Sequence, residues 1–140
     1  MMRILLSIFF LFILSSCRGL PESEAEAYAE PVSGRWVVVD WPEETGPSKE
    51  INLEIDWEQQ RLSAYAGCNQ MGASCQTTDG PGGIRIGPVF STEMFCEGLM
   101  QRELLFQKTL ERSDRMEQTK ETLALFQGTT LLFRAKSLEE

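Results

Sequence analysis

Apolar and polar residues alternate along much of the chain after about residue 34. The clearest case is 51–57, where every second residue is apolar, the period of a strand with one face in solvent. Similar runs predict further strands at 35–41, 62–66, 71–77, 84–86, 115–119, 122–126 and 130–135. Proline and glycine interrupt the pattern at 42–47 and 79–83, where we expect turns.

The period changes after Ser91 and Thr92, either of which could cap a helix. The apolar positions that then recur at steps near 3.6 residues are Phe95, Leu99, Phe106 and Leu110. They predict a helix over 92–112, with Glu103 on the same face. Gly98 weakens this helix by up to about 1 kcal/mol relative to alanine, so a kink or two short helices is the alternative.

The predicted elements come in the order strands, one helix, strands. This order favours an α+β fold in which a strongly bent antiparallel sheet packs on one main helix. All of these elements lie within 32–137, a length suited to one domain with a modest core. Trp36 and Trp57 fall on strands, where core packing is usual, whereas Trp41 beside Pro42 is expected to be exposed and available to a ligand.

The start of the chain has the layout of an export signal, with Arg3 before an apolar run at 4–14 and then two serines and Cys17. This run of eleven residues is shorter than the roughly 20 that a spanning helix needs. The segment resembles the lipobox of bacterial lipoproteins, which are cut before the cysteine and acylated on it. That resemblance makes 1–16 a signal peptide and Cys17 the lipidation site. The alternative is a signal cut elsewhere, with Cys17 an ordinary thiol.

Residues 17–31 would carry the lipid and an acidic tether, because they hold four glutamates, two prolines and few residues suited to a core. Repulsion between the glutamates keeps such a segment extended, which would hold the domain away from the bilayer. In the lipoproteins that the signal resembles, Asp after the cysteine favours the inner membrane. Arg18 stands there in this chain, so we expect the periplasmic face of the outer membrane.

Charge and composition exclude several classes of function. Without 1–16, the chain holds 12 Lys and Arg against 21 Asp and Glu, a formal charge of −9, so we expect no nucleic-acid partner and membrane contact through the lipid alone. The chain has no histidine, which excludes Ser-His and Cys-His catalysis and zinc sites that use imidazole. We therefore expect no catalytic residue, no metal and no cofactor.

Four segments together resemble the motifs of the META/HslJ (DUF306-like) domain family. They are Gly34-Arg35-Trp36, Gly67-Cys68-Asn69 with Gly72, Ser91 to Cys96, and Gln101-Arg102-Glu103 with Phe106 and Leu110. The resemblance implies a small α+β domain, often secreted or lipid-anchored, that is linked to stress responses and drug tolerance and has no established catalytic activity. It also implies a fold like a cracked barrel, which some members of the family have. The chain departs from the family pattern at Glu93, where the family has Arg, and by one extra residue at 101–103.

The resemblance also bears on the cysteines. Cys68 and Cys96 occupy the two cysteine positions of the family, and an exported chain meets an oxidising compartment, so we expect a disulfide between them. Two buried reduced thiols are the alternative. Cys75 would then be a single thiol, either buried or available for redox chemistry or an intermolecular link. Alternatively, Cys75 competes with Cys96 for Cys68.

Two polar residues in these motifs are candidates for structural or ligand contacts. We expect Asn69 to adopt a left-handed or turn conformation and to bond the local backbone, with ligand recognition as the alternative. Glu103, on an apolar helix face, needs a partner such as Arg35, Arg85 or a backbone amide. This favours a structural ion pair over a general acid.

The leading hypothesis is a non-enzymatic outer-membrane lipoprotein whose domain binds an envelope protein or a small ligand in stress or drug tolerance. The alternative is a pilot-like lipoprotein that binds lipid or a peptide and assists a secretion or envelope complex; it predicts an apolar cavity of several hundred Å³ in the barrel. A third hypothesis, an enzyme, predicts a cleft in which Glu103 or Cys75 is exposed with a strongly shifted pKa.

Overall fold

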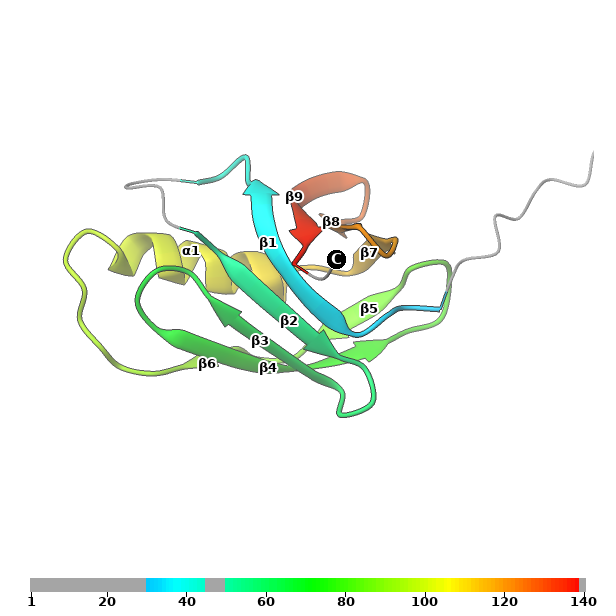
Figure 1. Cartoon of the computed structure of the whole chain (residues 1–140), viewed down its shortest axis with the longest axis horizontal. Helices are drawn as coiled ribbons and strands as arrows, with labels where there is room; N and C mark the ends of the chain where they lie inside the picture. The colour runs from blue at the N-terminus through cyan, green and yellow to red at the C-terminus, as the bar shows by residue number, and fades with distance from the viewer. Residues whose placement is uncertain (1–29, 45–49, 139–140) are drawn as a thin grey trace, which may run out of the picture.

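The computed structural model describes residues 30–44 and 50–138. The expected signal peptide, Cys17 and most of the tether lie outside the described residues. The described part forms strands and one helix in chain order (Figure 1). The bounds are β1 Gly34–Asp40, β2 Asn52–Asp56, β3 Arg61–Tyr65, β4 Gln70–Thr77, β5 Ile84–Ile86, β6 Phe90–Ser91, α1 Met100–Glu111, β7 Arg115–Gln118, β8 Thr122–Gln127 and β9 Thr130–Ser137.

The strands form one antiparallel sheet in the order β5-β4-β3-β2-β1-β9-β8-β7, with β6 paired to β4. β1 joins the two halves, because it pairs with β2 on one side and β9 on the other. The ends of the sheet meet where Gly83 bridges to Arg115 and the Ile84 N–H donates to the Asp114 carbonyl at 3.1 Å. The result is a nearly closed barrel dominated by strands, with α1 packed on it, which confirms the predicted bent sheet on one helix in outline.

Alternate residues of the strands other than β6 fill the inside of the barrel. The buried strand residues include Leu53, Ile55, Leu62, Ala64, Met71, Ala73, Ile84, Ile86, Met116, Leu123, Leu125, Phe133 and Ala135. From the helix, Phe106 and Leu110 enter the same core. The ring of Phe106 lies 5.6 Å from that of Phe133, centroid to centroid, so helix and sheet share one packed interior.

Trp41 is a correction to the sequence prediction. Its side chain is only 6% exposed, and its ring meets Phe106 edge-on at 5.2 Å between centroids. The Arg102 guanidinium lies 5.9 Å from the Trp41 centroid and covers it further. Trp36 is buried and Trp57 half-buried.

The helix is also shorter than the predicted 92–112, because α1 begins at Met100. Its N-cap is Leu99, which makes no side-chain capping bond. Gly98 has φ +77°, a left-handed conformation that a continuous right-handed helix does not contain. Within the described ranges, no helix has the length and apolar character needed to cross a bilayer.

Residues 92–99 therefore form a loop, which we call the α1 loop. Ser91 ends β6 and does not cap the helix, and Thr92 donates its hydroxyl to Asn69 instead. Phe95, predicted on the buried helix face, is 82% exposed. The position of this loop decides the shape of the candidate site.

Candidate functional site

The turn between β3 and β4 provides the floor of the site. Gly67 has φ +117°, which glycine adopts without strain, and the next two residues, Cys68 and Asn69, are buried. The sequence prediction placed a left-handed conformation at Asn69. Gly67 holds it instead, and Gln60 is the one non-glycine residue with positive φ among those described.

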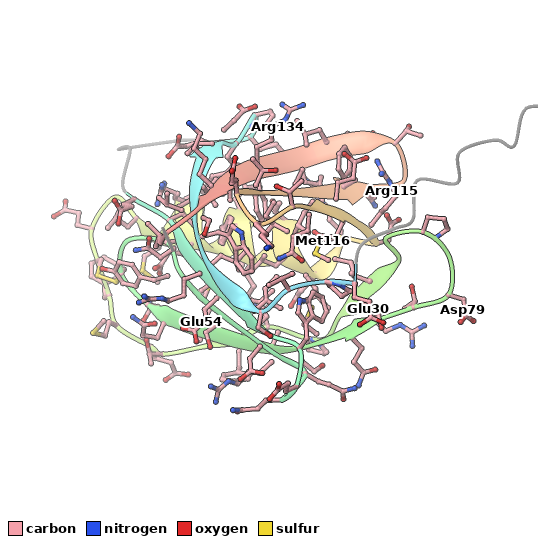
Figure 2. The ribbon with its side chains drawn as sticks, turned by 45° about the vertical axis from the view of Figure 1, so that its right-hand side comes forward. Glu30, Glu54, Asp79, Arg115, Met116 and Arg134 are labelled. Carbon is pink, nitrogen blue, oxygen red and sulfur yellow. A yellow bond between two sulfur atoms is a disulfide. The ribbon has the colours of Figure 1, made fainter. Side chains whose placement is uncertain are left out.

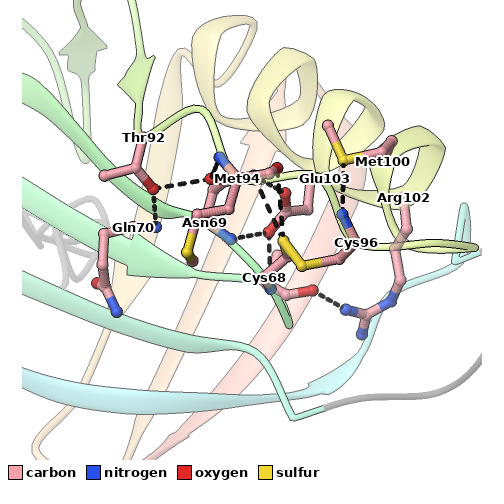
Figure 3. Close-up of a disulfide and its surroundings, with 10 residues drawn as sticks. Cys68, Asn69, Gln70, Thr92, Met94, Cys96, Met100, Arg102 and Glu103 are labelled. Carbon is pink, nitrogen blue, oxygen red and sulfur yellow. Dashed lines mark hydrogen bonds between the residues drawn. A yellow bond between two sulfur atoms is a disulfide. The ribbon is translucent and has the colours of Figure 1, made fainter.

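Glu103 reaches from the first turn of α1 to this turn and is 5% exposed (Figure 3). Its Oε1 accepts the backbone N–H groups of Cys68 at 2.9 Å and Asn69 at 2.5 Å. Its Oε2 accepts the Asn69 side-chain amide at 2.8 Å. Of the partners considered for Glu103, the structure supplies backbone amides and not Arg35 or Arg85. Both carboxylate oxygens therefore already accept hydrogen bonds from groups within the domain.

The Asn69 side chain connects this turn to the α1 loop. Its Oδ1 accepts the Met94 N–H and the Thr92 hydroxyl, each at 2.8 Å, and its Nδ2 donates to the Met94 carbonyl at 3.0 Å and to Glu103. The amide therefore uses two acceptor sites and two donor hydrogens, its full capacity. We expected bonds to local backbone, but these bonds run to a loop 25 residues further along the chain.

A covalent bond holds the same loop. Cys68 and Cys96 form a disulfide with their Cα atoms 6.1 Å apart, so the structure contains the bridge that the sequence led us to expect (Figure 3). The Cys96 N–H also lies 3.5 Å from the Met100 sulfur, its acceptor at the start of α1. The α1 loop is thus fixed to the β3–β4 turn at Thr92, Met94 and Cys96.

This arrangement leaves a groove between the α1 loop and α1, open to solvent and with a volume of about 430 Å³. Asn69 and Glu103 lie at its base. The apolar side chains that line it are Met71, Met94, Phe95, Met100 and Leu104, of which all but Met71 are exposed. The sequence analysis missed the groove, because the predicted helix placed the apolar residues of the loop on a buried face.

Comparison with known families settles the relationship that the motifs indicated. The META domain family matches residues 30–137. The chain belongs to the META domain family. The match covers the barrel, the helix and the α1 loop, and so includes the whole groove of this META domain.

The fold of this META domain is similar to the crystal structure of a DUF4847 family protein from Bacteroides vulgatus. The two share a TM-score of 0.54 and 13% sequence identity, and the match covers 80% of this chain and 94% of that one. At this identity the likeness shows the fold alone. No curated protein gives a significant sequence match to the chain.

Neither residue of the enzyme hypothesis lies exposed in a cleft of the META domain. Cys75 points into the barrel with 0% exposure, and this burial raises the pKa of its thiol to about 12. Its reactive thiolate is therefore scarce at neutral pH. Glu103 is buried among its three donors. Among the described residues, no group of three Cys, Asp or Glu could hold a metal ion.

Arg102 is a further site residue that the sequence analysis missed. It is 1% exposed, and it donates to the Ala66 carbonyl and, from Nη2 at 2.8 Å, to Glu44. It thereby holds the segment after β1 against the helix and the β3–β4 turn. The signal in the sequence was the extra residue beside Glu103, but its partner is 58 positions away in the chain.

The pilot-like hypothesis for lipid predicted a cavity inside the barrel. In the described part of the META domain, Phe106, Phe133 and Leu125 fill that interior with 0% exposure. The groove lies outside this core, between loop and helix. Its position suits a ligand that approaches from solvent, and a lipid chain enclosed by the barrel has no room there.

Proposed function

We propose that this META-family protein is a lipid-anchored binding module at the periplasmic face of the bacterial outer membrane, which presents its groove to an envelope partner in stress or drug tolerance. The observation that carries the proposal is the placement of the groove at the end of the barrel opposite to the tether. Glu30 lies beside the β4–β5 turn (Figure 2). The segment between β6 and α1, which lines the groove, lies at the other end of β4 (Figure 1).

The lengths of the tether and of β4 would allow the groove to be held away from the membrane. Residues 17–29 span at most about 44 Å when extended. The eight residues of β4 add about 27 Å between the tether end and the groove end. Several acyl chains on Cys17, at about 0.8 kcal/mol per buried CH₂, would hold such a protein stably. The groove would then face the periplasm.

The hydrogen bonds of the buried polar groups support a binding role and not catalysis. The carboxylate of Glu103 and the amide of Asn69 bond groups within the domain that shape the groove. The neutral Cys75 thiol lies in the core. The large side chains that remain accessible at the groove are Met94, Phe95, Met100 and Leu104, with Glu93 beside them, and such an apolar surface serves recognition.

The test places a photoreactive benzoylphenylalanine at Phe95 of the full chain in cells, with the same residue at Asp79 as the matched control. Both positions are exposed, one at the groove end and one at the tether end. We expect a discrete crosslinked product from position 95 and none from position 79. Products at both positions or at neither would contradict the binding function.

The anchor is tested in the same cells with Cys17→Ala. We expect the unaltered chain in the outer-membrane fraction and the variant in the soluble periplasmic fraction. Equal membrane recovery of the two forms would contradict lipid anchoring, whatever the crosslinking shows.

A further inference from the structure

The backbone next to the groove is an open strand edge. β6 pairs with β4 through Ser91 opposite Met71 and Phe90 opposite Gly72. The Thr92 N–H donates to the Gln70 carbonyl at 3.0 Å. In an antiparallel ladder the residues that bond the partner strand alternate with residues that face away from it. The backbone of Ser91 therefore faces away from β4.

Asn69 continues this alternation beyond the end of β6. Its side-chain amide accepts the Met94 N–H at 2.8 Å and donates to the Met94 carbonyl at 3.0 Å, which are the two bonds that a backbone peptide of a neighbouring strand would make. Residues 90, 92 and 94 thus bond inward. The backbone groups of Ser91 and Glu93 are directed to the other side, where the described residues provide no further strand.

The groove beside this edge has the chemistry of a peptide site. Three methionines line it, and their flexible, polarisable side chains adapt to apolar partners of different shape. Glu93 and Glu97 are exposed at the groove and the adjoining loop, and neither forms an ion pair with a described residue. A partner with positive charge is favoured there.

The same charges argue against the chain's own tether as the occupant. The tether has four glutamates and one arginine, so the acidic rim repels it. They also disfavour anionic headgroups. An exposed strand edge, in contrast, is completed by another strand, and an extended peptide supplies one.

We infer that the groove binds an extended peptide that adds as a strand to the edge at Ser91 and Glu93, with alternate apolar side chains on the methionines and Lys or Arg beside Glu93 and Glu97. This inference rests on the proposed binding function and assigns the class of partner. The partner is then a cationic, apolar-alternating segment of another protein.

The test uses the full lipoprotein in phosphatidylcholine vesicles and a fluorescent probe, acetyl-Lys-Val-Lys-Val-Lys-Val-Lys-amide. Binding is followed by anisotropy, with protein-free vesicles as the control for adsorption. We expect saturable binding to the protein-bearing vesicles and at least tenfold weaker binding of the counterpart with Glu in place of Lys. Equal binding of the two peptides, or equal signal from protein-free vesicles, would overturn the inference.

Two N-methylated probes test strand addition itself, one methylated at every Val and the other at every Lys. Only one of these sets faces the protein edge, because successive residues of a strand point their amides to opposite sides. We expect one set to bind at least tenfold more weakly than the parent peptide and the other to bind within about threefold of it. Equal effects of both sets, or no effect of either, would contradict strand addition.

A protein variant probes the same edge. Ser91→Pro removes an outward N–H, which an edge strand tolerates, and Ser91→Ala keeps it. We expect at least tenfold weaker peptide binding for the proline variant alone, with unchanged thermal unfolding. Unchanged binding in a folded Ser91→Pro protein would overturn the inference; if that variant unfolds, the N-methylated pair decides.

The results are separable from those of the proposed function. A crosslink from position 95 in cells together with no peptide binding would leave the binding module in place and reject this class of partner. Absence of both would reject both.

Discussion

At the scale of single residues, Asn69 has the widest influence on the site. Its amide makes four hydrogen bonds to Thr92, Met94 and Glu103, and it is 2% exposed. Because buried polar groups are costly when a partner is lost, each bond depends on the amide's having both donors and acceptors. Among side chains, only glutamine also carries a carbonyl acceptor together with two amide donor hydrogens, and glutamine is longer.

We predict that Asn69→Asp lowers the free energy of unfolding by about 2–4 kcal/mol at neutral pH, because a second carboxylate would face Glu103 and leave the Met94 carbonyl without its donor. Urea unfolding measures the loss. Gln70→Glu, the same charge change at the exposed neighbour, is the control and should shift stability by less than about 0.5 kcal/mol. Equal losses in the two variants would contradict the role of Asn69.

Cys75 gives a prediction for alkaline pH. Burial raises its folded pKa to about 12, above its ordinary value near 9, so the unfolded chain releases this proton first as pH rises. Stability should therefore fall from about pH 9 towards pH 12, with a slope of up to about 1.4 kcal/mol per pH unit from this group. Unfolding measured between pH 8 and 10.5 should show this part of the decline in the unaltered protein and not in Cys75→Val. If the stability of both proteins changed with pH in the same way, the role assigned to Cys75 would be wrong.

At the scale of elements, the strands were predictable and the start of the helix was not. A period of two is a local signal, and each strand with that pattern lies within a few residues of its predicted bounds. β6 has only two residues and shows no period. The α1 loop carries apolar residues at helical spacing, but Asn69, Cys68 and Gly98 hold it in another conformation.

The burial of Trp41 was also missed because it depends on contacts with a distant segment of the chain. Pro42 beside it indicated a turn, which is correct, but turns are not always exposed. Arg102 and Phe106, from a helix 60 or so positions further on, cover its ring. Contacts that join distant segments leave no periodic pattern in the sequence. The sequence therefore indicated candidate residues such as Asn69 and Glu103, but it did not indicate the groove that they help to form.

The disulfide is predicted to hold the α1 loop as well as to stabilise the fold. A bridge across 28 positions contributes roughly 3.5 kcal/mol in the chain-entropy account. We expect the double variant Cys68→Ser with Cys96→Ser to lose about 2–4 kcal/mol and to bind the Lys-Val peptide more weakly. Thiol counting in unreduced, denatured protein should find one reactive thiol among the three cysteines of the domain, that of Cys75. Three reactive thiols in the domain would show that the bridge is not formed.

Arg102 in α1 and Arg112, the C-cap of α1, form a matched pair. Arg102 is buried, forms an ion pair with Glu44 and donates to the Ala66 carbonyl, whereas Arg112 forms an ion pair with the exposed Glu43. Breaking a buried pair leaves a partner unsatisfied, so Arg102→Met should lower the unfolding free energy by about 3 kcal/mol and Arg112→Met by less than about 1 kcal/mol. Urea unfolding compares them. Equal effects would show that burial of Arg102 does not matter.

At the scale of the whole molecule, the barrel has two distinct ends. Glu30, near the end of the proposed tether, lies at one end and the groove opens at the other, with a packed core between them. The sequence pattern predicts a signal, a tether and a domain in that order, and the family match bears out the domain. The groove and Glu30 lie at opposite ends of the barrel because of the topology, since β4 runs from the groove end to the end where Glu30 lies.

The most direct test of the groove as a binding site is residue-resolved amide hydrogen exchange of the α1 loop, with and without the Lys-Val peptide. In the free protein we predict slow exchange at Thr92 and Met94, whose N–H groups bond Gln70 and Asn69, and exchange at least tenfold faster at Ser91 and Glu93. The peptide should slow Ser91 and Glu93 to the level of their neighbours. Protection of Ser91 and Glu93 in the free protein, or exchange unaltered by saturating peptide, would contradict the account.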